Sequence, residues 1–401
     1  MTPLNNKRIL LGVTGSIACY KAADLASKLR QAGAEVDVIL TSAATQFITP
    51  LTFQSVTGRR AYVDADLWGS EGHVLHISLA KEADLLVVAP ATANTLAKLA
   101  HGIADNLLAL AAVACESPLL IAPAMDGGMY HHAATQANIE TLKKRGAVIV
   151  GPEEGHLASG LRMVGRMTEP AELLGHIRQT LARGGPLAGK HVVVSAGGTQ
   201  EPIDPVRFIA NRSSGKQGYA LAQAALDLGA TVTLVSGPTA LAAPVGATRV
   251  DVRTAGEMLT AVLEYSRGAD ALVMAAAVAD FRPEQIAEHK IKKGGDAPVI
   301  KLAHTADVLK EVAAQKNGRP KVMVGFAAES RDLVENAEKK LTSKGLDLIV
   351  ANDVSAADAG FEVDTNRVTL LFADGSKEDL PLMGKDEMAA VILQRVAGLL
   401  K

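Results

Sequence analysis

The chain is poor in cysteine and in aromatic residues, and each shortage excludes a class of structure. Only two cysteines, Cys19 and Cys115, occur among 401 residues. No disulfide framework or cysteine-based zinc site is therefore expected, and a reducing compartment fits. Aromatic residues make up 3% of the chain. The core must consist mainly of Ala, Val, Leu and Ile, which suits parallel sheets covered by close-packed helices.

Long apolar runs and an excess of either charge are missing as well. No apolar stretch approaches the roughly 18–20 residues of a membrane span, and the N-terminus leads into an expected buried strand without a signal-peptide pattern. Lys and Arg number 41 against 43 Asp and Glu, a formal net charge of −2. No nucleic-acid or membrane partner is expected from such a balance. These features predict a cytoplasmic globular protein.

Short aliphatic runs alternate with longer helical patterns in the first half of the chain. Strands are expected at 9–13, 36–41, 85–89, 119–122 and 148–150, and helical patterns cover 18–31 and 92–114. Such alternation predicts an α/β fold with a doubly wound, mostly parallel sheet.

Paired glycines and a proline at 184–190 interrupt this pattern and indicate a linker. Alternation then restarts, with strands expected at 191–195, 232–236, 271–276, 322–326 and 348–351, a strand–turn–strand at 367–380 and a helix from Lys385. Each half opens with a strand, a Gly-rich turn and a helix. We therefore expect two Rossmann-like domains, 1–183 and 191–401, joined by a linker at 184–190.

Three motifs follow strands of the first domain. Gly15-Ser16-Ile17 lies in a strand-to-helix turn that lacks the GxGxxG fingerprint, and such a turn is either a phosphate site or a simple tight connection. Thr92 and Asn94 follow Pro90; Thr92 can cap a helix, or both can bind a cofactor. A Met-rich turn contains Met125 and Met129. Carboxyl ends of parallel strands share one edge, where ligands bind.

Taken together in this order and spacing, these motifs resemble those of the flavin-binding cysteine decarboxylases, and of the phosphopantothenoylcysteine decarboxylase domain in particular. The resemblance covers residues 1 to about 180. It implies bound FMN, which oxidises the cysteine side chain of the substrate to a thioaldehyde so that the neighbouring carboxylate leaves as CO₂. The reduced flavin then returns the hydride to the enethiol, giving 4′-phosphopantetheine. The resemblance implies FMN contacts from Gly15, Ser16, Ile17, Ser42, Pro90, Thr92, Asn94 and Met125, and a substrate contact from Met129.

The same resemblance implies a catalytic role for His76, which matches the family's active-site histidine and can move a proton near neutral pH. Without it, His73 and His76 would be a pair on a helix surface. Two family positions differ here: Asp126 replaces the usual Asn, and Ser159 replaces the usual Cys of the substrate-covering flap. A carboxylate only accepts hydrogen bonds, and a serine hydroxyl is far less acidic than a thiol. These changes bear on the final reductive step more than on flavin binding.

The second domain contains several groups suited to phosphates. Gly197, Gly198 and Thr199 can form an anion nest. A second group, residues 211–216, contains Ser213 and Ser214 and ends in Lys216 at the start of a helix, where it could bind an anion. In the simpler interpretation the two serines only cap the helix. Residues 275–283 predict a strand of small residues that ends in Asp280 and Arg282, and a basic loop follows at 289–293, which is either solvated or a phosphate site.

These motifs resemble the phosphopantothenate–cysteine ligase domain over residues from about 188 to 401. The resemblance implies that 4′-phosphopantothenate attacks CTP to give an acyl-cytidylate, which cysteine then converts to an amide. It assigns Lys290 to the phosphates, Asn211 to the acyl-cytidylate and Asp280 to cytidine. Further contacts are implied for Gly197, Gly198, Thr199, Arg207, Ser213, Ser214, Lys216, Ala277, Lys292, Lys293 and Phe326. Mg²⁺ is expected with CTP, at a site that the sequence does not specify.

Two alternatives remain open at this stage: a ligase whose flavin domain is an assembly scaffold, or a flavin-binding regulator of a phosphatase. The ligase motifs disfavour the second, and the missing GxGxxG disfavours a nicotinamide dehydrogenase. The resemblance also implies a homo-oligomer, with trimers of the first domain and dimers of the second giving a dodecamer.

Overall fold

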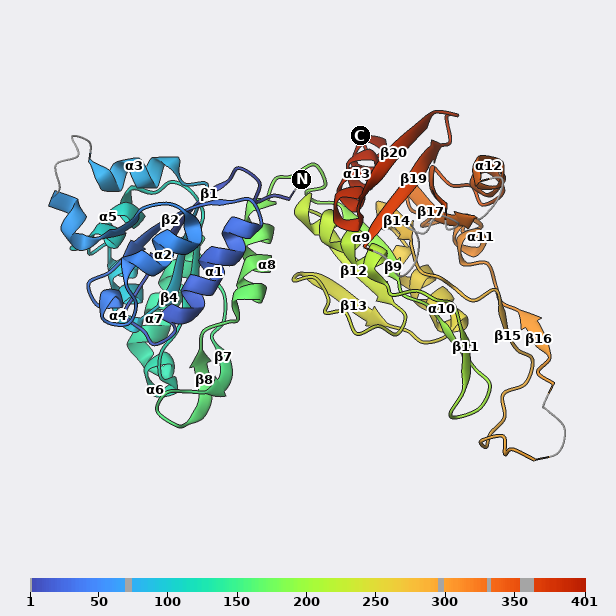
Figure 1. Cartoon of the computed structure of the whole chain (residues 1–401), viewed down its shortest axis with the longest axis horizontal. Coiled ribbons are helices and arrows are strands. Elements are labelled where there is room, and N and C mark those ends of the chain that lie inside the picture. Colours follow the sequence, from blue (N-terminus) through green and yellow to red (C-terminus); the bar gives the residue numbers. More distant parts are fainter. Residues whose placement is uncertain (1, 69–73, 295–298, 330–332, 354–363) are drawn as a thin grey trace. The chain divides into compact units, whose positions relative to one another are not determined.

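The aliphatic strands of the first half form one six-stranded sheet (Figure 1). Its strands are β1 (Arg8–Val13), β2 (Glu35–Leu40), β3 (Ala61–Val63), β4 (Leu85–Ala91), β5 (Leu119–Pro123) and β6 (Val148–Ile149). The order is β3-β2-β1-β4-β5-β6, and every pairing is parallel. The computed structural model describes residues 2–68, 74–294, 299–329, 333–353 and 364–401.

Helices cover both faces of this sheet because its strands are apolar on both sides. On β1, Leu11 packs with the core of α1 and α8, whereas Leu10 packs with that of α4 and α5. The helices are α1 (Cys19–Gln31), α2 (Pro50–Thr57), α3 (Leu75–Glu82), α4 (Ala93–His101), α5 (Leu107–Ala114), α6 (Gly127–His131), α7 (Ala133–Lys144) and α8 (Pro170–Leu181). Short 3₁₀ turns lie at Ala44–Gln46 and Asp64–Trp68, and a hairpin joins β7 (Glu153–His156) to β8 (Arg162–Arg166).

The helical pattern expected at 92–114 is two helices rather than one. α4 ends at His101 because Gly102 takes a left-handed φ of 68°, and α5 starts after Asn106, whose side chain caps it. The prediction of one helix was wrong because the apolar pattern continues across this break.

The second unit repeats the same topology on a larger sheet. Its strands are β9 (His191–Ala196), β12 (Thr231–Ser236), β13 (Ala247–Asp251), β14 (Ala271–Met274), β17 (Val322–Glu329), β18 (Leu348–Asp353), β19 (Thr365–Phe372) and β20 (Lys377–Gly384). The order is β13-β12-β9-β14-β17-β18-β19-β20. Pairings are parallel as far as β18 and antiparallel for β19 and β20. The predicted α/β class with two mostly parallel sheets is confirmed.

Two helical layers cover this sheet. Leu221 of α9 and Ile392 of α13 pack on one face, and Met258 of α10 packs on the other with α11 and α12. The helices are α9 (Lys216–Asp227), α10 (Ala255–Ser266), α11 (Val308–Ala313), α12 (Leu333–Ser343) and α13 (Lys385–Leu399). Across the described residues no helix combines the length and apolar character needed to cross a membrane.

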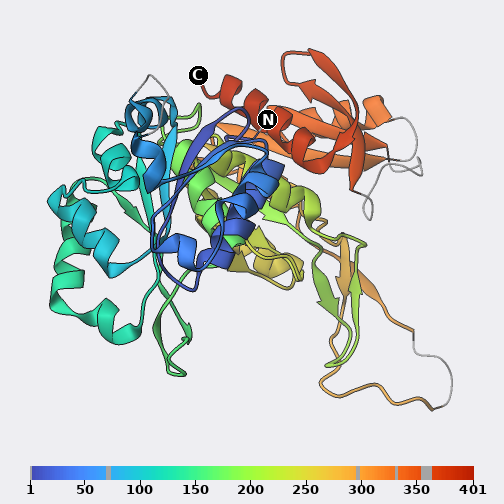
Figure 2. The same ribbon diagram turned by 60° about the vertical axis from the view of Figure 1, so that its left-hand side comes forward.

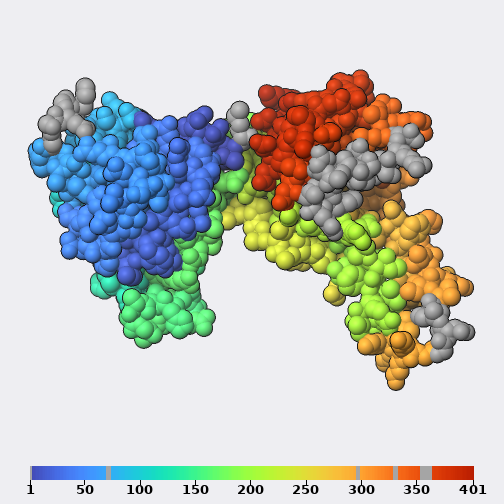
Figure 3. All heavy atoms as spheres, in the orientation of Figure 1, coloured from blue at the N-terminus to red at the C-terminus, as the bar shows by residue number. Residues whose placement is uncertain are grey.

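The prediction of one strand over 275–283 is wrong. β14 ends at Met274, and the next residues turn toward the loop after β9, where the Ala277 N–H donates to Gly197 O over 2.8 Å. The chain then enters β15 (Phe281–Pro283), which pairs with β16 (Leu302–His304) in a separate ribbon. This ribbon and the pair of β10 (Gln200–Pro202) and β11 (Phe208–Ala210) extend away from the second sheet (Figures 1, 2 and 3).

The chain divides into two compact units, Thr2–Leu181 and Ala182–Lys401. Residues 184–190, predicted as a linker, pack against the second unit. Leu187 is fully buried in its core, and its N–H donates to Leu228 O over 2.8 Å.

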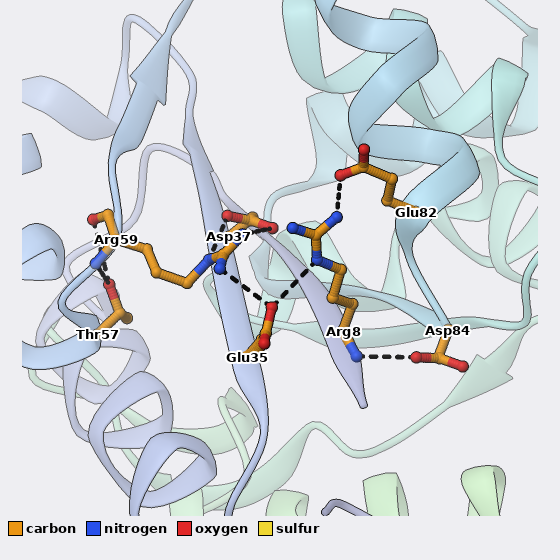
Figure 4. A network of polar contacts seen from close by, with 7 residues as sticks. All are labelled: Arg8, Glu35, Asp37, Thr57, Arg59, Glu82 and Asp84. Carbon is orange, nitrogen blue, oxygen red and sulfur yellow. Dashed lines mark hydrogen bonds and ion pairs between the residues drawn. The ribbon is translucent and has the colours of Figure 1, made fainter. Parts of the chain in front are cut away.

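Charged side chains bind together the amino ends of three neighbouring strands of the first sheet, away from the motifs (Figure 4). Arg59 donates to both oxygens of Asp37, over 2.8 and 3.0 Å, and to Glu35 over 3.0 Å. Glu35 also accepts from Arg8, which contacts Glu82 as well. Asp37 is 7% exposed, so its charge depends on Arg59. The side-chain hydrogen bond that Arg59 donates to Asp37 raises the pKa of Arg59.

We expect Arg59→Met to lower the free energy of unfolding of the first unit by about 2 kcal/mol, because it leaves a buried carboxylate without its cation. The matched control is Lys143→Met, which removes an exposed helical pair with Glu140 and should leave stability nearly unchanged. Urea unfolding of the full chain, followed by circular dichroism, measures both. Equal effects of the two variants would contradict this account of the network.

Candidate active sites

The carboxyl edge of the first sheet brings two predicted motifs together through Thr14. Its buried hydroxyl donates to Pro90 O over 2.7 Å and accepts from the Thr92 N–H over 3.1 Å. The loop after β1 is thereby joined to the loop after β4, at the point where the strand order reverses. Such a switch point is where open α/β sheets bind ligands. The sequence motifs did not indicate Thr14, because its two partners lie 76 and 78 residues away.

The loop after β1 leaves the start of α1 open to an anion. Gly15 lies so close to Ala43 that a Cβ would come within 2.5 Å of the Ala43 side chain. The Ser16 hydroxyl accepts from the Ala18 N–H over 3.3 Å, and no acidic residue lies in the first turn of α1. Free N–H groups at a helix N-terminus favour phosphate. Ile17 is 61% exposed beside them, which gives an apolar surface next to the polar one.

Five predicted residues line one cavity of about 270 Å³: Ser16, Ile17, Met125, Asp126 and Ser159. The cavity lies between the start of α1, the turn after β5 and the hairpin at 153–166, which we call the flap. Figure 1 shows the flap beside α6. The Met125 N–H donates to Gly165 O over 3.0 Å, and a Cβ on Gly165 would lie 2.2 Å from Met125 O. The flap is therefore anchored at its base to the turn after β5.

Asp126 and Ser159, the two positions that depart from the family pattern, are hydrogen-bonded to each other. The Ser159 hydroxyl donates to Asp126 Oδ2 over 2.7 Å, and the Gly128 N–H donates to Oδ1 over 2.9 Å. These donors, Ser159 first, lower the pKa of Asp126 below its ordinary value. The carboxylate also caps α6.

Other predicted residues lie outside this cavity. Asn94 is exposed on α4, and Thr92 caps that helix by accepting from the Thr95 N–H over 3.3 Å. Ser42 donates to Asp64 over 2.6 Å. His76 lies on α3, where its Nδ1 is buried without a hydrogen-bond partner among the described residues. His73 lies outside the described residues.

Lys21 is a cavity residue that sequence reasoning missed. Its side chain is 5% exposed, and its ammonium donates to Met167 O over 2.7 Å and to Glu169 over 2.9 Å. The bond from Lys21 lowers the pKa of Glu169. A signal was available, since Lys21 falls on the buried face of α1 together with Ala22 and Leu25.

In the second unit the loop after β9 is joined to the segment after β14. Gly197 has a φ of 77°, and a Cβ there would lie 3.0 Å from Gly237 O, so the position requires glycine. The Thr199 N–H donates to Ala277 O over 3.2 Å, and its hydroxyl accepts from the Ala279 N–H over 2.9 Å. Thr199 is fully buried, so its side chain supports these loops, and its contact with the nucleotide stays a prediction.

Ser213, Ser214, Lys216 and Phe326 line a small cavity of about 70 Å³ at the start of α9. Gly215, not a serine, occupies the cap position of α9, and it supplies no side-chain hydrogen bond. No acidic residue lies in the first turn. The Ser213 hydroxyl nevertheless accepts from the Gly215 N–H over 3.4 Å, and the Ser214 hydroxyl from the Lys216 N–H over 3.5 Å. Both serines thus bond N–H groups at the start of the helix, as the simpler interpretation expects.

Lys385 and Asn352 line the same cavity and were not predicted. Lys385 is 7% exposed, and burial, followed by the charge of Lys216, lowers its pKa although Asp364 opposes this. Lys216 itself donates to Asp364 over 2.6 Å. Asn352 Oδ1 is buried without a partner among the described residues.

Asp204 joins the predicted Arg207 to the basic loop and was missed as a site residue. Its buried carboxylate accepts from the Val206 and Arg207 N–H groups, each over 2.8 Å, from the Ile291 N–H over 3.1 Å, and from Arg207 Nε over 3.0 Å. Arg207 also donates to Ile291 O over 2.5 Å. The basic loop is thereby fixed at Ile291.

Most of the remaining predicted residues of the second unit are exposed, namely Asn211, Asp280, Lys290, Lys292 and Lys293, whereas Gly198 is buried. The Asn211 amide donates to Val278 O over 3.2 Å. These residues do not line the cavity at α9. No group of three or more His, Cys, Asp or Glu side chains suited to a metal ion occurs in the part of the chain that the structure describes.

We expect the basic loop to detach as Asp204 becomes protonated. Burial raises the pKa of Asp204, but the N–H donors and the Arg207 charge outweigh it and bring the pKa to about 2, against 3.8 ordinarily. A lowered pKa stabilises the fold above about pH 3.8, and this contribution is lost as the pH falls toward 2. Pepsin cleavage within 286–294 should therefore increase between pH 4 and 2.5. In Asp204→Asn it should be fast already at pH 4, and equal cleavage of the parent at both pH values would contradict the assignment.

Comparison with known proteins agrees with this two-unit organisation. The Flavoprotein family model matches residues 1–182, and the model of the DNA/pantothenate metabolism flavoprotein C-terminal domain matches residues 187–400. The coenzyme A biosynthesis bifunctional protein CoaBC of Bacillus subtilis is 47% identical, with 99% of this chain and 98% of that protein covered. That of Escherichia coli K12 is 43% identical, with 98% and 97% covered.

Solved structures match the two halves separately. The crystal structure of the C-terminal domain of CoaBC covers 54% of this chain and 98% of its own, with 42% identity and a TM-score of 0.47. A mutant phosphopantothenoylcysteine (PPC) decarboxylase complexed with pantothenoylaminoethenethiol covers 43% and 97%, with 34% identity and a TM-score of 0.40. The resemblance inferred from the motifs is confirmed: the chain belongs to the family of bifunctional coenzyme A biosynthesis proteins.

Proposed function

We propose that the second unit uses CTP to join 4′-phosphopantothenate to cysteine, and that the first unit uses FMN to decarboxylate the product to 4′-phosphopantetheine. The observation that carries this proposal is the repeated site geometry. Each sheet has the same strand order around its switch point, followed by a helix, α1 or α9, with no acidic residue in its first turn. Relatives that cover nearly the whole chain are named coenzyme A biosynthesis bifunctional proteins.

The carboxyl edge of the first sheet fits FMN in two respects. The N-terminus of α1 at Gly15 and Ser16 suits the phosphate group. Exposed Ile17 offers apolar surface for the flat ring, and exposed Met129 is assigned to the substrate. Bound FMN would supply reversible oxidation of the cysteine side chain. We assign Pro90, Thr92, Asn94, Met125 and Ser42 to the same group, through the loops that Thr14 and Asp64 hold together.

The protein groups of the decarboxylase would position the substrate and handle protons. Asp126 and Ser159 face the cavity under the flap, so the cysteine end of the substrate would lie between them and the flavin. His76 has a buried Nδ1 with no partner in the described residues, and a buried polar atom without a partner is costly. We propose that a substrate or flavin group, or a second copy of the chain, satisfies it.

In the ligase, cationic and N–H groups would stabilise charge on the phosphates of CTP. We assign Ser213, Ser214, Lys216 and Phe326 to the nucleotide, because they share the cavity at α9. Gly197, Gly198 and Ala277 would form the floor of this site. Asn211 would hold the acyl-cytidylate, Asp280 the cytidine, and Lys290 with Lys292, Lys293 and Arg207 the anionic groups. Mg²⁺ would bridge the triphosphate.

Three further parts of the proposal concern the protein as a whole. We propose domains at 1–183 and 191–401, a homo-oligomer with dodecameric assembly, and a cytoplasmic location. Exposed apolar side chains such as Met129 and Phe208 are consistent with surfaces that subunits cover.

A single incubation tests the two activities. Purified protein is supplied with 4′-phosphopantothenate, cysteine, CTP and Mg²⁺, and the products are identified by mass. We expect 4′-phosphopantetheine, CMP, pyrophosphate and CO₂. If phosphopantothenoylcysteine accumulates instead, the first unit is an assembly scaffold and the decarboxylase part is wrong. If neither product forms, both parts are wrong.

Variants should separate the activities. We expect His76→Asn to lower conversion of phosphopantothenoylcysteine by at least about 100-fold, as removal of a general acid–base group does, while ligation stays within about twofold. Lys290→Ala should lower ligation and leave the conversion of phosphopantothenoylcysteine within about twofold. Lys310→Ala, at an exposed helix position of the second unit, is the control for Lys290. Loss of both activities in either variant would refute the assignment of separate sites.

A further inference from the structure

The two positions at which the chain departs from the family pattern make direct contact. Ser159 donates to Asp126 over 2.7 Å across 33 residues of chain. Asp126 follows β5 and Ser159 lies in the flap, so sequence neighbourhood does not bring them together. If the family's Asn and Cys had been replaced independently at an inactive site, no hydrogen bond between the two new side chains would be expected. The contact therefore indicates that the changes belong together.

The Asp126 carboxylate serves two donors at once. Oδ1 accepts from the Gly128 N–H over 2.9 Å and Oδ2 from the Ser159 hydroxyl over 2.7 Å. An asparagine has one carbonyl oxygen and one NH₂ group. If that oxygen kept the Gly128 N–H, the NH₂ group would face residue 159. The bond to Ser159 would then run in the opposite direction, with the hydroxyl as acceptor.

A cysteine at 159 is poorly matched to a carboxylate. A thiol is a weak donor, so it would hold Asp126 less well than the Ser159 hydroxyl does. The negative charge would also disfavour the thiolate and raise the thiol pKa. An amide NH₂ facing sulfur also forms only a weak bond, but it places no negative charge beside the thiol. Asp with Ser has a charge-assisted bond, and Asn with Cys places no charge beside a thiol. Asn with Ser keeps only a neutral bond, and Asp with Cys places a charge beside a weak donor.

The pair also determines how the tip of the flap lies over the cavity. Backbone bonds anchor the flap at its base, between Met125 and Gly165. At the tip, Leu157 and Leu161 close a tight turn through a 2.8 Å bond from the Leu157 N–H to Leu161 O, and this turn presents Ser159. The hydrogen bond from the Ser159 hydroxyl to Asp126 then connects the flap tip to the turn after β5.

We propose that Asp126 and Ser159 work as one unit, in which Ser159 is a positioning residue that holds the Asp126 carboxylate and the flap tip over the substrate. The unit takes the place of the Asn and Cys of the family pattern. This inference rests on the proposed decarboxylase function of the first unit.

The test uses four full-length chains: the parent, Asp126→Asn, Ser159→Cys, and the double variant that restores the family pattern. The first measurement, amide hydrogen exchange of the peptide spanning 155–161, requires no turnover. We expect each single change to speed exchange by about tenfold, which corresponds to the loss of about one charge-assisted hydrogen bond. The double variant should return to within about threefold of the parent. Glu154→Ala, which removes an exposed flap pair with Arg162, is the control and should stay within about twofold.

The second measurement is conversion of phosphopantothenoylcysteine to 4′-phosphopantetheine by the same chains. We expect the same pattern, with both single variants slow and the double variant recovered. If the effects of the two single changes on exchange or on turnover multiply in the double variant, the residues act independently and the inference is wrong. A parent that does not decarboxylate would refute the proposed function, and the exchange data would still decide whether the residues are coupled.

Discussion

Both sites depend on one constraint, the parallel arrangement of strands on either side of a switch point. Because β1 and β4 run in the same direction, the loops that follow them open at one edge of the sheet and diverge. The helix after β1 then begins in that gap, with no acidic residue in its first turn. β9, β14 and α9 repeat this arrangement. The chemistry differs between the units because the loop residues differ, not because the frameworks do.

Loops at such an edge need internal ties, and the structure supplies them with buried polar groups. Thr14 joins the loops of the first unit, Thr199 joins those of the second, and Asp204 fixes the basic loop. The Thr14 hydroxyl and the Asp204 carboxylate are occupied by these bonds, and the Thr199 hydroxyl accepts one. Their role is to hold neighbouring segments at fixed separation, which is what a site built from several loops requires.

Much of the fold followed from the sequence because aliphatic strands and helical periods alternate so regularly. The failures have physical causes. The helical pattern of apolar residues continues across Gly102, so the break between α4 and α5 was not predicted. The small residues after Met274 predicted a strand, but the chain turns there toward Gly197. For the sites, local motifs identified Ser16, Met125, Asp126, Ser159, Ser213 and Lys216, which line cavities.

The missed residues share a different property: their partners are distant in sequence. Lys21 bonds residues 146 and 148 positions away, and Asp204 bonds Ile291 87 positions away. A single charged residue within an apolar pattern indicates burial only when its counterpart is known. Spacing alone could not supply that counterpart, and His76, Asn211 and Lys290 lie outside the two cavities, so their roles stay predictions.

The central claim is that one chain carries two separate sites, each at the carboxyl edge of its own sheet. Mixing His76→Asn with Lys290→Ala tests this most directly. Each variant keeps one site, so the phosphopantothenoylcysteine made by the first should be decarboxylated by the second. We predict 4′-phosphopantetheine from the mixture at about half the parent's rate or less, and almost none from either variant alone. A mixture that forms none, although each variant retains its own activity, would contradict the claim.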